Sequence, residues 1–200
     1  MNFIAHLFLS GTNEKLLVGN FIADSVKGKN ILDYDSEIIK GIKFHRFIDF
    51  YTDTHPEVRI ARKTLVDKYR HYSGVIIDIF FDYFLINNWD LYSNTSVDIF
   101  SKNVITVLQK HSDIMPEKAL MFLNYNIKNN RFNTYGEIYT IAKVLNGMAR
   151  RTTFANNMSN AVEELNTNNS YFDNVFNTYF PQLIKACEVH LAESETNNNI

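Results

Sequence analysis

Apolar residues recur every three or four positions along most of the chain, which is the spacing of an amphipathic α-helix and not the alternation of a β-strand. Only three prolines and seven glycines interrupt 200 residues, so long helices can run without a break. The pattern therefore predicts an all-α, compact helical bundle. The expected helices span residues 2–9, 14–27, 36–53, 56–70, 72–89, 95–111, 116–127, 134–149, 155–166 and 170–192.

A chain of this length usually builds one hydrophobic core, and no repeat or low-complexity linker divides it. We expect one helical domain over residues 1–193 and a flexible C-terminal tail over residues 194–200. Two helix starts have a signature. Pro56 occupies the first turn of its helix, and Thr134 precedes Glu137 by the three residues of a capping box.

Composition and charge exclude several classes of function. The formal net charge of −2 gives no support to a nucleic-acid partner. Cys187 is the only cysteine, which excludes an intramolecular disulfide and a thiolate zinc site and is typical of a cytoplasmic protein. The longest apolar run, residues 74–86, contains two aspartates and is shorter than the ~20 residues that span a bilayer, so no membrane partner is expected. Residues 1–9 lack the basic start of a signal peptide.

Pairs of polar residues lie four positions apart within the otherwise apolar helices before residue 83. This spacing places both side chains of a pair on one helix face. A single buried histidine is more often a core residue than a ligand, but a recurring arrangement of imidazoles and carboxylates favours a metal site. The four pairs are Asn2 with His6, Asn20 with Asp24, His45 with Asp49, and Asp78 with Asp82.

The segment around Asp78 and Asp82 is hydrophobic around nearly its whole circumference, which predicts a buried helix. Two buried carboxylates repel each other, and each loses several kcal/mol of hydration unless a cation compensates it. A divalent metal would provide that compensation. The alternative is a pair of buried salt bridges, for which the candidate partners are Arg46, Arg150 and Arg151.

Imidazole and carboxylate ligands without sulfur favour Mn²⁺, Mg²⁺ or Fe²⁺, with Zn²⁺ still allowed, and metal-assisted hydrolysis is the natural reaction class. Arginines would orient a phosphate, although Arg150 and Arg151 could equally compensate a helix dipole. His55 precedes Pro56 and could be a ligand, a helix-start residue or a substrate contact. The chain has no Walker A loop, G-x-S-x-G elbow or H-E-x-x-H motif.

These residues resemble the acyl carrier protein phosphodiesterases, also called acyl carrier protein hydrolases. The most specific similarity lies in the block from His45 to Pro56 and in the block that holds Asp78 and Asp82. The resemblance covers most of the chain up to about Tyr125. The other similar blocks are residues 1–7, 19–24, 27–28, 41–44 and 72–77, together with Trp89.

The resemblance implies an all-helical fold related to the HD-domain phosphohydrolases and a Mn²⁺-dependent enzyme, with Mg²⁺ or Fe²⁺ as alternatives. Such an enzyme hydrolyses the phosphodiester between 4'-phosphopantetheine and a serine of holo-acyl carrier protein, which leaves the apo-protein. The implied catalytic residues are His6, Asp24, His45, Asp49, Asp78 and Asp82, and all of these except His6 are expected metal ligands. The expected phosphate or substrate contacts are Arg46, His55, Arg150 and Arg151. The consecutive His-Asp that names the HD superfamily is absent, since His45 and Asp49 lie four residues apart.

Charge is distributed unevenly along the chain. Residues 27–70 hold ten Lys and Arg against seven Asp and Glu, whereas residues 155–200 hold one Lys against six acids. The basic segment carries His45 and Asp49 and would suit an acidic carrier protein as substrate. Two alternatives stay open: an HD-like phosphohydrolase acting on a nucleotide or another small phosphodiester, and a non-catalytic helical binding module.

Overall fold

The computed structural model describes residues 3–152 and 156–196, and every regular element within these ranges is helical, which confirms the all-α prediction. The α-helices are α1 (Phe3–Leu9), α2 (Glu14–Ile22), α3 (Ser36–Thr54), α4 (Pro56–Tyr69), α5 (Ser73–Asn87), α6 (Val97–Lys110), α7 (Glu117–Lys128), α8 (Arg131–Thr134), α9 (Ile138–Ala149), α10 (Ala161–Thr167) and α11 (Asn169–Thr196). Short 3₁₀ helices join them: η1 (Ala23–Ser25), η2 (Gly28–Asp33), η3 (Arg70–Tyr72), η4 (Trp89–Leu91), η5 (Ser112–Ile114) and η6 (Met158–Asn160).

Some predicted boundaries differ from the observed ones. The predicted capping box at Thr134 is wrong. Thr134 lies at the end of α8, where its hydroxyl donates to the Asn130 carbonyl oxygen (3.1 Å), and α9 begins only at Ile138. The last helix continues to Thr196 and so includes three residues of the expected tail. Residues 197–200, like Asn2 and the predicted start of a helix at residue 155, lie outside the described residues.

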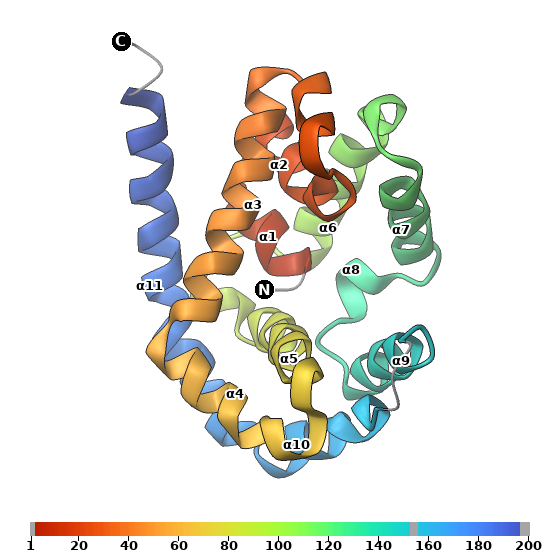
Figure 1. Cartoon of the computed structure of the whole chain (residues 1–200), viewed down its shortest axis with the longest axis vertical. Helices are drawn as coiled ribbons and strands as arrows, with labels where there is room; N and C mark the ends of the chain where they lie inside the picture. The colour runs from red at the N-terminus through yellow and green to blue at the C-terminus, as the bar shows by residue number, and fades with distance from the viewer. Residues whose placement is uncertain (1–2, 153–155, 197–200) are drawn as a thin grey trace.

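The short helix α1 lies at the centre of the molecule in Figure 1, with α3 on one side of it and α6 and α8 on the other. Helix α5 packs beneath α1, and α11 runs along the outer side of α3 and α4. Aromatic rings join α5 to α11, as in the contact of Phe81 with Tyr179, whose centroids are 5.3 Å apart. Among the described residues, no helix combines the length and apolar character that crossing a bilayer requires.

Two glycines allow α2 and α3 to cross at close range. A Cβ atom added to Gly19 would lie 2.9 Å from the Gly41 Cα, which is closer than side chains pack. Since Asn20 follows one of these glycines and His45 lies one turn beyond the other, the crossing brings the Asn20 carbonyl oxygen to 2.9 Å from the His45 Nδ1. The backbone packing of two helices thus positions the side chains described next.

Candidate functional site

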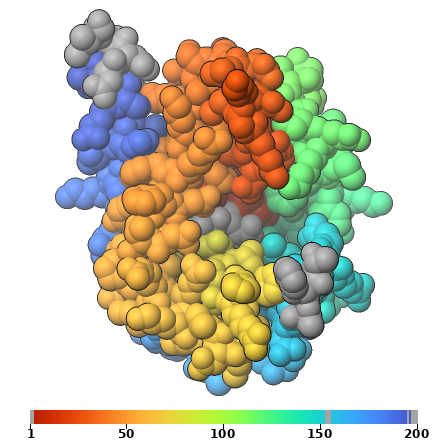
Figure 2. Space-filling model, viewed as in Figure 1, coloured from red at the N-terminus to blue at the C-terminus, as the bar shows by residue number. Residues whose placement is uncertain are grey.

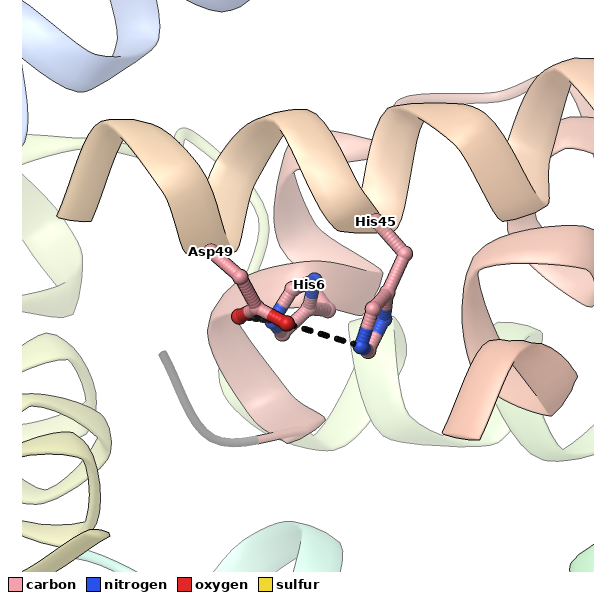
Figure 3. A group of neighbouring side chains, drawn as sticks. All are labelled: His6, His45 and Asp49. Carbon is pink, nitrogen blue, oxygen red and sulfur yellow. Dashed lines mark hydrogen bonds and ion pairs between the residues drawn. The ribbon is translucent and has the colours of Figure 1, made fainter. Parts of the chain in front are cut away.

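Two imidazoles and a carboxylate converge between α1 and α3 (Figure 3). The Nε2 atom of His6 lies 3.1 Å from Asp49 Oδ1, and the Nε2 atom of His45 lies 3.2 Å from Asp49 Oδ2. The two rings stack with their centroids 4.0 Å apart. One ligand atom from each of the three residues lies within 4.8 Å of the other two, which makes the three residues candidates to hold one metal ion.

A fourth group completes this site from the solvent side. Asp24 in η1 is exposed, and its Oδ1 lies 3.5 Å from His45 Nε2. We call His6, Asp24, His45 and Asp49 the histidine–aspartate cluster. All four were predicted from the sequence, and they come from three elements that are separate along the chain.

Burial and hydrogen bonding give the members of the cluster different proton affinities. Burial lowers the pKa of His6 to about 4. Burial also disfavours charge on His45, but its hydrogen bonds to Asp24 and Asp49 outweigh that effect and raise its pKa to about 9. Burial likewise opposes ionisation of Asp49, yet its bonds to the two histidines hold the pKa of its carboxyl well below the usual range. At neutral pH the cluster therefore combines one imidazolium, one neutral imidazole and two carboxylates.

This donor set fits a divalent metal. Imidazole nitrogens and carboxylate oxygens without sulfur are ligands suited to Mn²⁺, Fe²⁺, Mg²⁺ and Zn²⁺. The net negative charge of the protonated cluster attracts a cation, and a metal that displaced the His45 proton would face two carboxylates at once. His6, His45 and Asp49 could bind it from the interior, with Asp24 on the open side.

The predicted pair Asp78 and Asp82 shares α5, but the two carboxyl groups have different surroundings. Asp82 is fully buried and accepts hydrogen bonds from the backbone N–H groups of Ile4 (2.9 Å) and Ala5 (3.0 Å), so it contacts the first turn of α1 and not the other predicted ligands. Burial raises the pKa of Asp82 to about 7 against the effect of these bonds. Burial also raises the pKa of Asp78, and the nearby charges of Asp49 and Asp53 raise it further, which places Asp78 within electrostatic reach of the cluster.

The predicted substrate contacts lie in three different places. Arg46 is exposed on α3, and Arg150 is exposed at the end of α9. Arg151 lines the cavity beside the cluster, and its Nε donates to the Gly147 carbonyl oxygen (3.0 Å). His55 is buried between α3 and α4, where its ring lies edge-on to Tyr179 at 5.0 Å. His55 therefore packs against α11 and takes no part in the cluster.

A cavity of about 700 Å³ opens beside the cluster. In Figure 2 the red segment of α1 lies recessed on this face, between the orange of α3 and the green and cyan of the later helices. Lys118 and Arg151 add two cations to the polar part of the wall, which is otherwise formed by His6, Asn20, Asp24, Ser25, His45 and Thr152. Most of the remaining wall is apolar: Phe3, Phe21, Tyr72, Val75, Ala119, Met121, Phe122, Tyr125, Met148 and Met158.

Sequence patterns missed two parts of this site. Asn20 belongs to one of the polar pairs, but its side chain contacts both imidazoles, with Oδ1 2.9 Å from His6 Nδ1 and 3.0 Å from His45 Nδ1. Lys118 and the apolar residues of α7 have the spacing of an ordinary amphipathic helix. No signal in the sequence distinguishes such a helix from one whose apolar side chains line a cavity.

The fold and the site together define an all-α protein with a histidine and carboxylate centre at the wall of a largely apolar cavity. Residues 1–183 match the family model described as acyl carrier protein phosphodiesterase, and the chain belongs to this family.

Curated relatives named acyl carrier protein phosphodiesterase cover nearly the whole chain. The protein of Photorhabdus laumondii is 33% identical over 189 residues, which are 94% of this chain and 96% of that protein. The protein of Yersinia pestis is 30% identical over 189 residues, 94% and 98% of the two chains. The protein of Klebsiella pneumoniae strain 342 is 33% identical over 192 residues, again 94% and 98%. No solved structure matches this chain significantly, and the relation to the HD-domain fold therefore stays a prediction.

Proposed function

We propose that this protein is a divalent-metal-dependent phosphodiesterase that hydrolyses the bond between 4'-phosphopantetheine and the serine of holo-acyl carrier protein, releasing the apo-protein. The observation that carries the proposal is the histidine–aspartate cluster on the wall of a largely apolar cavity, in a member of this family. A phosphodiester at the end of a largely apolar substrate arm needs such a combination of charged centre and apolar cavity.

The residues of the cluster have two roles, metal binding and orientation of the imidazole rings. His6, His45, Asp49 and Asp24 would hold the metal, with Mn²⁺ expected first and Mg²⁺ or Fe²⁺ as alternatives. A metal bound there supplies positive charge to a phosphoryl oxygen and lowers the pKa of bound water. Asp49 contacts both imidazoles through its two oxygens, which fixes the rings relative to each other.

The cavity supplies the remaining recognition. Lys118 and Arg151 place positive charge in the wall beside the cluster, where they would pair with a phosphate oxygen. The apolar stretch that includes Phe122 and Met148 would cover the pantetheine arm and exclude water from it. The carrier protein itself stays outside, and the basic excess of residues 27–70, which lies in α4 and η3, would attract its acidic surface.

Metal removal tests the proposal directly. Purified protein and holo-acyl carrier protein are incubated with Mn²⁺, with and without excess EDTA, and the carrier is weighed by mass spectrometry. We expect loss of the phosphopantetheine mass only without chelator. Exchange of His45 for alanine should lower the rate by at least ~100-fold, because losing a group that merely orients a ligand already costs 10- to 100-fold.

Exposed Lys102 on α6 pairs with Asp98, so K102A controls for loss of a surface cation. A carrier mass that stays unchanged with Mn²⁺, or that falls equally with EDTA, overturns the proposal. Fast hydrolysis of small phosphodiesters without activity on the carrier protein would instead support the alternative phosphohydrolase function.

A further inference from the structure

Asn20 lies behind the two imidazoles, on the side away from Asp49. Its side chain is buried, with a 1% exposed fraction for the residue, and it makes four polar contacts. One end of the amide lies 2.8 Å from the His6 carbonyl oxygen and 2.9 Å from Ser10 Oγ. The other end lies 2.9 Å from His6 Nδ1 and 3.0 Å from His45 Nδ1.

These contacts fix the orientation of the amide. A backbone carbonyl oxygen only accepts hydrogen bonds, so the Asn20 atom next to the His6 carbonyl is the NH₂ group. Ser10 gives its one hydroxyl hydrogen to the same carbonyl (2.9 Å) and therefore accepts the second N–H of Asn20. The amide oxygen must then be the end that faces the two ring nitrogens.

An oxygen that faces two Nδ1 atoms can accept a hydrogen from each of them. We infer that Asn20 is a positioning residue that holds His6 and His45 together in the Nδ1–H form when a metal takes the place of the hydrogen bonds between their Nε2 atoms and Asp49. The backbone carbonyl of Asn20 supports this arrangement, because it lies 2.9 Å from the same Nδ1 of His45. The inference deepens the proposed function and rests on it for its consequence, the convergence of two lone pairs on one metal.

In the metal-free protein the opposite tautomer can donate from Nε2 to Asp49, so it is unfavourable only on the Asn20 side of each ring, whereas with a metal bound it is unfavourable on both sides. A neutral imidazole with its hydrogen on Nε2 would direct an Nδ1 lone pair at the Asn20 oxygen, which also offers a lone pair. The same ring would place a hydrogen where a metal must bind. One buried amide therefore prepares two ligands from α1 and α3 at once, a role that protein metal sites generally give to a carbonyl or carboxylate behind the ligand.

Nuclear magnetic resonance of ¹⁵N-histidine-labelled protein loaded with Zn²⁺ tests the tautomers independently of activity. Zn²⁺ is used because this donor set also suits it and because, unlike paramagnetic Mn²⁺, it leaves the ring signals sharp. We expect both rings to carry the hydrogen on Nδ1, each with a slowly exchanging Nδ1–H signal. An Nε2–H form for either ring would overturn the inference.

Variants of the amide complete the test. N20A should lose the slow Nδ1–H signal of His6, while that of His45 persists through the Asn20 backbone carbonyl, and should weaken Mn²⁺ binding about 10- to 100-fold in a calorimetric titration. S10A, which removes only the hydroxyl behind the amide, keeps the Asn20 oxygen and is the matched control. Circular dichroism confirms that each variant is folded.

If folded N20A keeps both tautomers and the Mn²⁺ affinity of the parent, Asn20 is merely structural and the inference is wrong. If the tautomers are as expected but the carrier protein is not hydrolysed, the proposed function fails while the assignment of Asn20 stands. Should N20A be unfolded, the ring tautomers of the unaltered protein decide the question alone.

Discussion

Two aspartates one helical turn apart on α5 show how differently the fold can use the same residue. The sequence predicts that both are metal ligands or partners of arginines. Asp82 instead satisfies backbone N–H groups at the start of α1, which lack a partner within their own helix. Asp78 lies nearer the cluster, and the charge of Asp49 raises its pKa. A carboxylate on an apolar helix thus signals a special environment without specifying which one.

Asp82 should make stability fall as pH rises. Its folded pKa of about 7 lies above the ordinary value of 3.8, so the folded state keeps a proton that the unfolded chain releases between these pH values. Rising pH therefore favours unfolding by up to ~1.4 kcal/mol per pH unit from this group. Urea unfolding between pH 5 and pH 8 should show a flatter dependence for D82N than for the parent protein.

In D82N the side chain still offers one oxygen to the backbone N–H groups of α1. The variant therefore loses the titrating carboxyl group but keeps one hydrogen-bond acceptor. Exposed Asp90 in η4 provides the control, because D90N also removes one carboxylate. Parallel pH curves for the parent protein and D82N would contradict a buried protonated Asp82.

The crossing of α2 and α3 is the decisive contact between elements. The helix ranges were mostly predictable, and α4 begins at Pro56 as its sequence indicates. The angle and distance at which two helices meet were not predictable, because periodicity describes one helix at a time. Gly19 and Gly41 resemble any other small residues in the sequence, yet their backbones touch and bring Asn20 to His45.

A methyl group at this crossing should separate the helices. We expect G19A to lower the free energy of unfolding by about 1–3 kcal/mol, since an added carbon in a close-packed contact must displace backbone. That corresponds to a fall in Tm of roughly 3–10 °C, measurable by thermal unfolding. G147A in α9 is the control, because its added Cβ meets only Arg151 Nη2 at 4.0 Å. An unchanged Tm for G19A would show that the crossing tolerates a wider spacing.

At the scale of the whole molecule, the small net charge is the sum of a basic excess in one part of the chain and an acidic excess in another. The basic excess of residues 27–70 lies in α4 and η3, because α3, which carries His45 and Asp49, holds three Lys and Arg against three Asp and Glu. The acidic C-terminal segment forms α10 and α11, which Figure 1 shows at the bottom and along the outer side of the molecule. An acidic partner would therefore be steered toward α4, the helix that follows the cluster-bearing α3.

Charge reversal should weaken the reaction with the carrier protein selectively. Lys43 and Arg59 are exposed on α3 and α4. We expect the double variant K43E/R59E to lower kcat/KM for holo-acyl carrier protein by roughly ten-fold at low salt, with a smaller effect at high salt. Hydrolysis of a small phosphodiester should change little. K102E on α6 is the control, and an equal loss on both substrates would contradict steering by these helices.

The sequence by itself determined the helical class, most helix ranges, the family and the residue types of the cluster. These follow from local periodicity and from blocks of residues that are readable along one chain. Four of the six predicted catalytic residues meet in space, namely His6, Asp24, His45 and Asp49.

Only the tertiary structure decided which polar pairs share a site. It placed Asp82 at the start of α1 and His55 against α11, and it brought Asn20, Lys118 and Arg151 to the cluster and its cavity. The physical reason is that spacing fixes which side chains share a face of one helix, whereas the distance between helices depends on how closely their surfaces pack.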